Sequence, residues 1–335
     1  MKKVALIACD HGFGHTKRCY IYGMELAKKE LEVSLFARED GLRKFSKIYG
    51  TMSNLHLIPF RTQSCPSNSK NQWMQWLNKL PNLDTFQCIV SDNLPEILEL
   101  RQDALLSGSF LWHLDLPAID KKYKAHCESL IAQYRPIHLA ADFFVSEELR
   151  SFSKIVPLGL IGKVKSGAPK ANFEKGALLI SGGRNSILKA ELSSFVEKLI
   201  LNKEKPNFSK VWVDANLLPD NYPKWIRVAT YNKEMYQSLS VALIRPGVGT
   251  VTDCLRNRVF ILAIAEEENI EMITNINALE QSNYGIKVLN ESLQNTSLEV
   301  ILKESYSTFL EKSKSTLFQG EKQFADYVQN KFDER

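Results

Sequence analysis

The sequence predicts an α/β protein that is built from two Rossmann-like domains. Its 335 residues are enough for two domains of ordinary size, each with its own hydrophobic core. Short apolar segments alternate with segments of helical periodicity, which is typical of strand–helix–strand units with parallel strands. In both halves of the chain an apolar segment leads directly into a glycine turn and a helix, at residues 4–18 and 241–255. This repeated design indicates two parallel sheets, each covered by helices.

The N-terminal half contains a series of short apolar segments that we expect to be strands. They are Val4–Ile7, Glu32–Ala37, Leu55–Phe60, Phe86–Val90 and Leu105–His113. Helices are expected over Thr16–Lys29 and Leu42–Tyr49, around Trp73 and Trp76 before Pro81, and from Cys127, where a short strand ending at Ala140 follows. A strand, a helix and a strand in succession form a parallel crossover, so these segments predict one parallel sheet.

The C-terminal half repeats this pattern after a polar segment that contains Gly167 and Pro169. Such segments are typical of linkers, so we expect one domain at residues 1–160 and a second at residues 161–320. Strands of the second domain are expected at Ala177–Ile180, Val211–Val213, Ile226–Val228, Val241–Ile244, Phe260–Ala265 and Ile286–Leu289, with helices up to Leu201 and over Lys233–Leu239. Helices at Ser292–Leu302 and Ser305–Phe332 are expected to end the chain, with residues 321–335 packing back on the N-terminal domain.

The first glycine turn joins Val4–Ile7 to the helix that follows. Gly12 and Gly14 let the backbone turn tightly and approach a ligand, and the start of the helix presents unpaired N–H groups to an anion. His15 is a candidate general base, and the alternative is that it only caps the turn. The turn lacks the third glycine of a dinucleotide-binding fingerprint and the Gly-Lys-Ser/Thr ending of a P-loop, so neither of those sites is expected.

Polar side chains end two of the predicted N-terminal strands. Asp92 lies in the Ser91–Asn93 segment after Phe86–Val90, and His113 ends the strand that begins at Leu105. Ligands bind at the carboxyl ends of parallel strands, so both side chains are candidates for a site. The alternatives are that Asp92 caps the next helix and that His113 has a structural role.

The second glycine turn carries groups that suit a nucleoside diphosphate. Gly247 and Gly249 expose the backbone, Thr250 offers a hydroxyl at the start of a helix, and Arg245 adds a positive charge. Asp253, one turn into the helix, is placed to accept hydrogen bonds from a ribose diol. An aspartate in the first turn of a helix is also favoured by the helix dipole, which is the structural alternative.

Three hydrogen-bonding side chains, Glu280, Gln281 and Asn283, precede the last predicted strand. Such side chains near a strand end are able to recognise a sugar, and surface polarity is the alternative explanation. The acidic run Glu266–Glu268 is expected to be a solvated face.

Taken together, these motifs resemble those of glycosyltransferases with the GT-B architecture, in which two Rossmann-like domains face each other across a cleft. His11–Arg18 is similar to the His-Gly-x-Gly-His-x-x-Arg run of predicted glycosyltransferases related to the enzyme that adds N-acetylglucosamine to the peptidoglycan lipid precursor. Arg245–Asp253 is similar to the Gly-x-Gly-Thr-x-x-Glu run that holds the nucleotide in that group. Glu280–Asn283 is similar to the acid-Gln-x-x-Asn stretch that touches the donor sugar. The resemblance covers nearly the whole chain.

The resemblance implies a hexosyltransferase that moves a sugar from a nucleotide-sugar donor, UDP-linked, to an acceptor hydroxyl, with inversion and without a metal or cofactor. The C-terminal domain would hold the donor, and the N-terminal domain the acceptor, a glycan, lipid or small molecule, with His15 as the base. The donor-binding residues would be Gly12, Gly14, Arg18, Gly182, Gly183, Arg184, Arg245, Gly247, Gly249, Thr250, Asp253, Glu280, Gln281 and Asn283, and the acceptor-side residues His11, Asp92 and His113.

Two positions depart from the pattern of the family. Asp253 stands where members place a ribose-binding Glu, and Tyr284 follows Asn283 where relatives often carry Ala. These departures leave the identity of the sugar open.

Two alternative functions also fit these residues. Gly12–Cys19 resembles the Gly-x-Gly-His-x-x-Arg-Cys opening of the nucleotide-sugar hydrolase of pseudaminic acid synthesis, in which His15 would activate water. A non-catalytic nucleotide-sugar-binding protein is the second alternative. Release of nucleotide with or without an acceptor distinguishes the three functions.

Composition excludes several other classes of protein. The net charge of +5 is mild, which argues against a nucleic-acid surface and is compatible with an anionic ligand or with peripheral contact with a membrane. The six cysteines include no Cys-x-x-Cys pair, so neither a disulfide framework nor a zinc site is expected. No run reaches the ~20 apolar residues of a membrane-spanning helix. We therefore expect a cytoplasmic protein, and the sequence does not define its oligomeric state.

Overall fold

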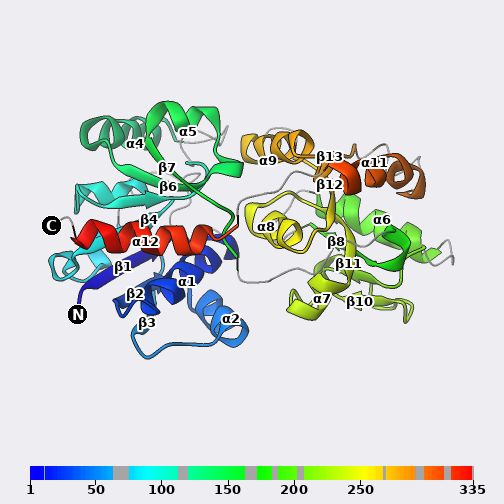
Figure 1. The fold of residues 1–335 in the computed structure, drawn as a ribbon, viewed down its shortest axis with the longest axis horizontal. Helices are drawn as coiled ribbons and strands as arrows, with labels where there is room; N and C mark the ends of the chain where they lie inside the picture. Colours follow the sequence, from blue (N-terminus) through cyan, green and yellow to red (C-terminus); the bar gives the residue numbers. More distant parts are fainter. Residues whose placement is uncertain are drawn as a thin grey trace. The chain divides into compact units, whose positions relative to one another are not determined.

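The chain divides into two compact units in the computed structural model (Figure 1). Unit 1 consists of Met1–Lys163 and Thr316–Arg335, and unit 2 of Val164–Ser315. The structure describes residues 1–10, 12–62, 75–111, 120–162, 172–182, 188–201, 207–266, 269–289, 291, 298–312 and 318–333, except for the side chains of residues 304 and 312. The C-terminal segment thus belongs to the same unit as the N-terminus.

Unit 1 is built on a parallel sheet of seven strands in the described residues, in the order β3-β2-β1-β4-β5-β6-β7. The strands are β1 Lys3–Ala8, β2 Glu32–Ala37, β3 Leu55–Pro59, β4 Cys88–Asp92, β5 Leu105–Ser107, β6 Ile137–Ala141 and β7 Lys154–Leu158. The strand order reverses between β1 and β4. In open parallel sheets, ligands bind beyond the carboxyl ends of the strands at such a switch point.

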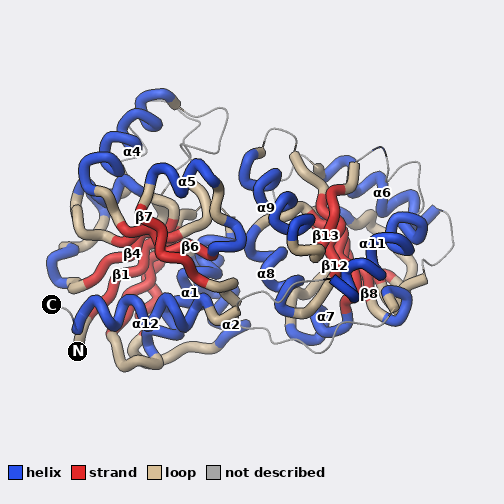
Figure 2. Tube along the Cα trace, turned by 45° about the horizontal axis from the view of Figure 1, so that its top comes forward, coloured by secondary structure: helices blue, strands red, loops and turns tan. Residues whose placement is uncertain are grey.

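Helices cover both faces of this sheet (Figure 2). They are α1 Phe13–Ala27, α2 Glu39–Tyr49, α4 Lys121–Tyr134, α5 Glu147–Phe152 and α12 Gly320–Asp333, with the 3-10 helices η2 Leu77–Lys79, η3 Leu83–Thr85, η4 Pro95–Glu99 and η5 Asp142–Phe144. Because successive side chains of a strand point to opposite faces, Val4 and Leu6 of β1 belong to one core cluster, and Ala5 and Ile7 to another. The continuous apolar character of β1 follows from burial on both faces.

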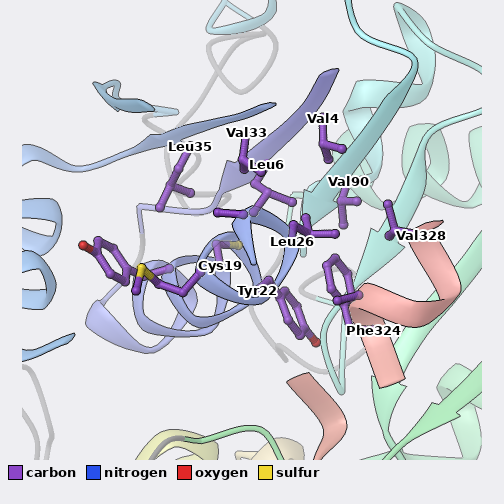
Figure 3. Packing of buried hydrophobic residues seen from close by; sticks show 14 of the residues in the cluster. Val4, Leu6, Cys19, Tyr22, Leu26, Val33, Leu35, Val90, Phe324 and Val328 are labelled. Carbon is purple, nitrogen blue, oxygen red and sulfur yellow. The ribbon is translucent and has the colours of Figure 1, made fainter. Parts of the chain in front are cut away.

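Helix α12 completes the core of unit 1. Figure 3 shows Phe324 and Val328 of α12 beside Tyr22 and Leu26 of α1, below Val4 and the other strand residues of the cluster. The rings of Tyr22 and Phe324 are stacked with their centroids 3.6 Å apart. The last helix therefore contributes apolar surface that the rest of unit 1 does not supply.

Unit 2 contains a second parallel sheet, with six strands in the described residues and the order β10-β9-β8-β11-β12-β13. Its strands are β8 Ala177–Ser181, β9 Val211–Val213, β10 Ile226–Val228, β11 Leu239–Ile244, β12 Phe260–Ala263 and β13 Gly285–Lys287. Its helices are α6 Lys189–Leu201, α7 Lys233–Ser238, α8 Val248–Arg256, α9 Ile270–Gln281 and α11 Leu298–Lys312, with η6 Phe173–Lys175 and η7 Ala215–Leu217. The switch point lies between β8 and β11.

Some predicted elements were wrong in extent. Helix α11, Leu298–Lys312, runs through the boundary expected between Leu302 and Ser305. Helix α12 begins separately at Gly320, after Gln319, whose φ of +83° no right-handed helix accommodates. The strand predicted from Leu105 to His113 ends at Ser107, since Gly108 turns the chain with a φ of +130°. Trp76 precedes a 3-10 helix rather than lying in an α-helix, and Trp73 lies outside the described residues.

No helix among the described residues is both long enough and apolar enough to cross a membrane.

Candidate functional site

The switch point of unit 1 holds a buried pair of charged and titratable side chains. His15 lies in the first turn of α1, just beyond the turn that follows β1, and Asp92 is the last residue of β4. Since β1 and β4 are neighbours in the sheet, the two side chains meet, and Nδ1 of His15 lies 2.6 Å from Oδ1 of Asp92. His15 is 7% exposed and Asp92 is fully buried.

Arg18 and Ser107 complete the surroundings of the Asp92 carboxylate. Arg18 lies one turn after His15 on α1, and its Nε and Nη2 donate to Oδ2 and Oδ1 of Asp92 at 2.6 and 2.8 Å. The hydroxyl of Ser107, at the end of β5, donates to Oδ2 at 2.8 Å. Burial raises the pKa of Asp92, but the charge of Arg18 and the hydrogen bonds from His15 and Arg18 outweigh it and hold this pKa well below its usual range. Asp92 is therefore ionised.

An ionised Asp92 determines where the hydrogen of the neutral His15 ring lies. A carboxylate accepts but does not donate, so Nδ1 must carry a hydrogen at a distance of 2.6 Å. Nε2 is then the ring nitrogen that is able to take up a proton. A histidine oriented in this way by a carboxylate has the chemistry of a general base.

A second histidine shapes the backbone beside this cluster. Nε2 of His138, on β6, lies 2.8 Å from the carbonyl oxygen of Gly108. A Cβ atom at Gly108 would lie 3.5 Å from Nη2 of Arg18, and the φ of +130° also favours glycine. Burial lowers the pKa of His138 to about 4, so His138 is neutral and donates to Gly108.

The glycine turn before α1 has free space beside both of its glycines. Gly12 has a φ of +87°, and no atom lies within 4 Å of a Cβ atom built on Gly12 or Gly14. Helix α1 has no side-chain cap at Gly12 and no acidic residue in its first turn. Arg38 and Lys44 lie over the ring of Phe13, at 5.6 and 4.7 Å from its centroid. This end of α1 thus combines helical N–H groups with nearby positive charge, which favours an anion.

The switch point of unit 2 holds the second glycine turn. The turn follows β11, and its Arg245 N–H donates to the carbonyl of Ser181, the last residue of β8, at 3.0 Å. Gly247 is the N-cap of α8, which has no side-chain cap and no acidic residue in its first turn. Thr250 lies in that first turn. Within the turn, the Gly247 N–H donates to the Arg245 carbonyl at 2.8 Å and the Thr250 N–H to the Gly247 carbonyl at 3.1 Å. The positive end of the helix dipole still favours an anion at this position.

Arg245 adds a positive charge to the same turn. Its Nε donates to Oε1 of Glu266 at 3.2 Å, and its Nη1 lies 3.7 Å from the position of a Cβ atom on Gly247. Glu266 follows β12, so neighbouring strands provide the arginine and the carboxylate that orients it. The sequence had suggested only a solvated face for Glu266.

Asp253 lies in the second turn of α8 and is 6% exposed. Its neighbour is the buried hydroxyl of Tyr236, on α7. Burial and the charge of Asp253 raise the pKa of Tyr236 well above its ordinary value. The Asp253 carboxylate therefore has a partner within unit 2.

Other residues that the sequence did not indicate shape the carboxyl edge of this sheet. Asp214, just after β9, accepts hydrogen bonds from the Ser181 hydroxyl at 2.8 Å, the Gly182 N–H at 3.2 Å and the Tyr231 hydroxyl. Asn275 of α9 is 1% exposed and donates its amide to the carbonyl of Pro246 at 2.7 Å. Asp214 could have been identified from the sequence as a candidate site residue, because it follows an apolar strand. Asn275 lies within a helix, where no such pattern marks it.

The structure does not bring Glu280, Gln281 and Asn283 to the second glycine turn. Glu280 and Gln281 are the last two residues of α9, and Asn283 follows it. The Tyr284 carbonyl accepts from the N–H of Ile261 at 3.0 Å, near the start of β12. A crossover helix runs antiparallel to its strands, so this end of α9 lies at the amino edge of the sheet. Oε1 of Glu280 accepts from the Lys287 N–H at 2.9 Å.

Four predicted site residues lie outside the described residues: His11, His113, Gly183 and Arg184. Within the described ranges, no group of three or more His, Cys, Asp or Glu side chains is arranged to hold a metal ion.

Solved structures of glycosyltransferases share the fold of this chain. Os79 from O. sativa, in complex with UDP, is 13% identical, with a TM-score of 0.63 over 98% of this chain and 99% of Os79. The calicheamicin glycosyltransferase CalG4 is 12% identical, with a TM-score of 0.61 over 99% of this chain and 98% of CalG4. The spinosyn rhamnosyltransferase SpnG, complexed with thymidine diphosphate, is 13% identical, with a TM-score of 0.59 over 99% and 100% of the two chains.

No protein-family model and no curated protein sequence matches the chain. At 12 to 13% identity, the likeness to solved structures establishes the fold alone. The predicted fold class, two Rossmann-like domains of the GT-B type, is confirmed.

Proposed function

We propose that this protein is a glycosyltransferase that transfers a sugar from a nucleotide-sugar donor to an acceptor hydroxyl. The observation that carries the proposal is the contact between His15 and the ionised Asp92 at the switch point of unit 1. The fold, which the chain has in common with glycosyltransferases, supports the same function. The names of the compared structures include complexes with UDP and with thymidine diphosphate, which supports a nucleoside diphosphate as the leaving group.

His15 is the proposed base of this transfer. Its Nε2 takes the proton from the acceptor hydroxyl while the acceptor oxygen forms a bond to the anomeric carbon of the sugar. The bond between that carbon and the diphosphate oxygen breaks, and its electron pair leaves with the nucleoside diphosphate. Attack from the face opposite the leaving group inverts the anomeric centre. Asp92 orients the ring and stabilises the imidazolium that forms.

Unit 2 is the proposed donor-binding unit. The turn formed by Gly247, Gly249 and Thr250 at the positive end of the α8 dipole would hold the diphosphate, and Arg245 would neutralise the charge that develops on it. Stabilisation of this kind needs no metal ion. Gly182 lies beyond the neighbouring strand β8, at the same edge of the sheet, and is included in the proposal. Glu280, Gln281 and Asn283 are left out, because they lie at the opposite edge.

The donor is proposed to be UDP-linked on the basis of the sequence resemblance to the peptidoglycan-precursor enzyme. The acceptor is defined by the hydroxyl group that it must carry.

The test is release of nucleotide from a panel of UDP-, GDP-, TDP- and CMP-sugars, with and without an acceptor extract. We expect release that depends on the acceptor, and we expect His15→Ala to retain the fold but to lose this turnover by about 10²–10⁴-fold. The matched control is His56→Ala, since His56 is a half-exposed histidine on β3 of the same unit.

Each other outcome has a defined meaning. Release in water alone would favour the hydrolase, with His15 as the base for water. Nucleotide-sugar binding without any release would favour the non-catalytic binding protein. Wild-type turnover in His15→Ala would exclude His15 as the base.

A further inference from the structure

The predicted role of Arg18 does not fit its contacts. The sequence resemblance assigned Arg18 to the donor, yet its guanidinium is buried and faces Asp92 of the same unit. Its Nε and Nη2 donate to the two oxygens of this carboxylate at 2.6 and 2.8 Å. A two-point contact of this kind fixes the position and direction of both groups. These N–H groups are therefore already used within unit 1.

The Asp92 carboxylate is fully occupied by donors from the described residues. A carboxylate can accept about four hydrogen bonds. Oδ1 lies within hydrogen-bond distance of His15 Nδ1 and Arg18 Nη2, at 2.6 and 2.8 Å. Oδ2 accepts from Arg18 Nε and the Ser107 hydroxyl, at 2.6 and 2.8 Å. Arg18 supplies half of these contacts and the positive charge that balances the buried carboxylate.

Loss of the Arg18 charge would change which atoms carry hydrogens in the pair formed by His15 and Asp92. Without a neighbouring cation, a buried carboxyl group takes up a proton more readily. A protonated Asp92 would donate its O–H to Nδ1 of His15, and the ring hydrogen would then lie on Nε2. A neutral ring in that state cannot accept a proton at Nε2, which is the nitrogen that the proposed mechanism requires.

We propose that Arg18 is a positioning residue, which keeps Asp92 a pure hydrogen-bond acceptor and thereby holds the ring hydrogen of His15 on Nδ1. This inference rests on the function proposed above. The main contact of Arg18 is with Asp92, and its Nη2 also lies 3.3 Å from Nδ1 of His15. In this role Arg18 contacts neither the donor nor the acceptor. The flat guanidinium suits this role because one side of it reaches both carboxylate oxygens, which a lysine ammonium cannot do with the same geometry.

The first readout is the tautomer of His15 in the full chain, measured from the ¹⁵N chemical shifts of the imidazole and assigned with His15→Ala. The wild type is expected to carry the hydrogen on Nδ1, and Arg18→Met on Nε2. Arg18→Lys, which keeps a positive charge, is expected to retain Nδ1–H in a large fraction of molecules. A ring hydrogen on Nδ1 in Arg18→Met would overturn the proposal.

The second readout is the division between kcat and KM. Arg18→Met is expected to lower kcat by about 10²–10⁴-fold and to leave the KM for the nucleotide sugar unchanged. An arginine that bound the donor would instead raise KM when removed, and that result would also overturn the proposal. Arg43→Met is the matched control, because it makes the same substitution at an exposed position of α2 in the same unit.

The variants and readouts keep the outcomes separate. Circular dichroism shows whether Arg18→Met folds, and a variant that fails to fold gives no result on the tautomer. In that case Arg18→Gln, which keeps N–H donors but carries no charge, takes the place of Arg18→Met. A ring hydrogen that stays on Nδ1 in Arg18→Gln, together with an unchanged kcat, would then contradict the role. The tautomer is measured without turnover, so a wild type that transfers no sugar would refute the proposed function and still give the tautomer result.

Discussion

Asp92 and Asp214 are buried aspartates that organise the carboxyl edges of the two sheets through different partners. Asp92 has a histidine, an arginine and a serine around it, whereas Asp214 is bonded to two hydroxyls and a backbone N–H. Burial and the charge of Asp214 raise the pKa of Tyr231, so this hydroxyl stays protonated. Among these described groups, only the cluster in unit 1 therefore joins its aspartate to a histidine, the side chain with the chemistry of a general base.

Asp253 provides a test of the donor site at the level of one side chain. We expect Asp253→Ala to weaken the binding of UDP by about one order of magnitude, the loss that one hydrogen bond to a ribose hydroxyl accounts for. Titration calorimetry measures this, and thermal unfolding confirms that the variant retains its fold. Glu280→Ala is the control, because Glu280 is an exposed carboxylate at the opposite edge of the sheet. Unchanged affinity in Asp253→Ala would rule out the ribose contact.

The sequence predicted the residues that follow strands and missed those that depend on strand order. His15 was identified because it lies in the glycine turn after the first apolar segment, and Asp92 because it lies just beyond the end of another. The contact between Arg18 and Asp92 joins positions 74 residues apart, and it exists because β4 lies beside β1. Ser107 and His138 reach the cluster for the same reason, from β5 and β6. No local pattern encodes such pairings.

At the scale of elements, α12 is attached to unit 1 by a close approach of two backbone segments. The Gly320 N–H donates to the carbonyl of Leu160 at 3.2 Å, and the Gly159 N–H donates to Gln323 at 2.6 Å. A Cβ atom on Gly320 would lie 1.8 Å from the carbonyl oxygen of Gly159. Only a glycine permits this contact.

Gly320→Ala is therefore expected to destabilise unit 1 by about 1–3 kcal/mol, because the backbone of one segment must move to remove the overlap. The free energy of unfolding of unit 1 is measured in urea, with the hydrogen exchange of the β1 amides as the readout. Gly14→Ala is the control, since Gly14 is helical and has no atom within 4 Å of its Cβ position. Equal stabilities of the two variants would show that the segments adapt without cost.

Helix boundaries near the end of the chain were the least predictable part of the fold. The expected helix Ser305–Phe332 contains Gly320, and a glycine inside a helical pattern is compatible both with a continuous helix and with a break. The division follows from packing, because α12 starts where Gly320 meets Gly159 and its apolar residues then enter the core cluster of unit 1.

At the scale of the whole molecule, two buried groups in unit 1 give opposite pH dependences of stability. Burial lowers the pKa of His138 from 6.5 to about 4, so the unfolded chain binds more protons in this range and stability rises with pH. Burial raises the pKa of Glu96 from 4.5 to about 7, so the folded chain binds more protons and stability falls as pH rises. Between pH 4.5 and 6.5 the two effects cancel.

Single substitutions are expected to reveal each effect. His138→Gln removes the contribution of the histidine, so that only the contribution of Glu96 remains. The free energy of unfolding of this variant should fall, relative to the wild type, by about 1.4 kcal/mol per pH unit from pH 4.5 to 6.5. Glu96→Gln should show a rise of the same size. Hydrogen exchange of the β1 and β4 amides at several pH values measures the stability of unit 1. Identical pH profiles in the wild type and both variants would contradict the assignment.

The two-domain fold was predictable because its signals are local and repeated. Each half of the chain has the strand, the glycine turn and the helix that open a parallel unit, and the two sheets have related strand orders. The order of residues along the chain does not reveal which edge of a sheet a helix end reaches. That is why the group Glu280–Asn283 was expected at a sugar site and lies at the amino edge instead.

The return of the chain to unit 1 sets an order for folding during synthesis. Unit 2 is continuous in sequence, so all of its strands leave the ribosome before α12 does. Unit 1 remains without Phe324 and Val328, and hence with an uncovered apolar surface beside Tyr22, until the last helix has been made. The N-terminal sheet, although synthesised first, is therefore the part of the molecule that reaches its final state last.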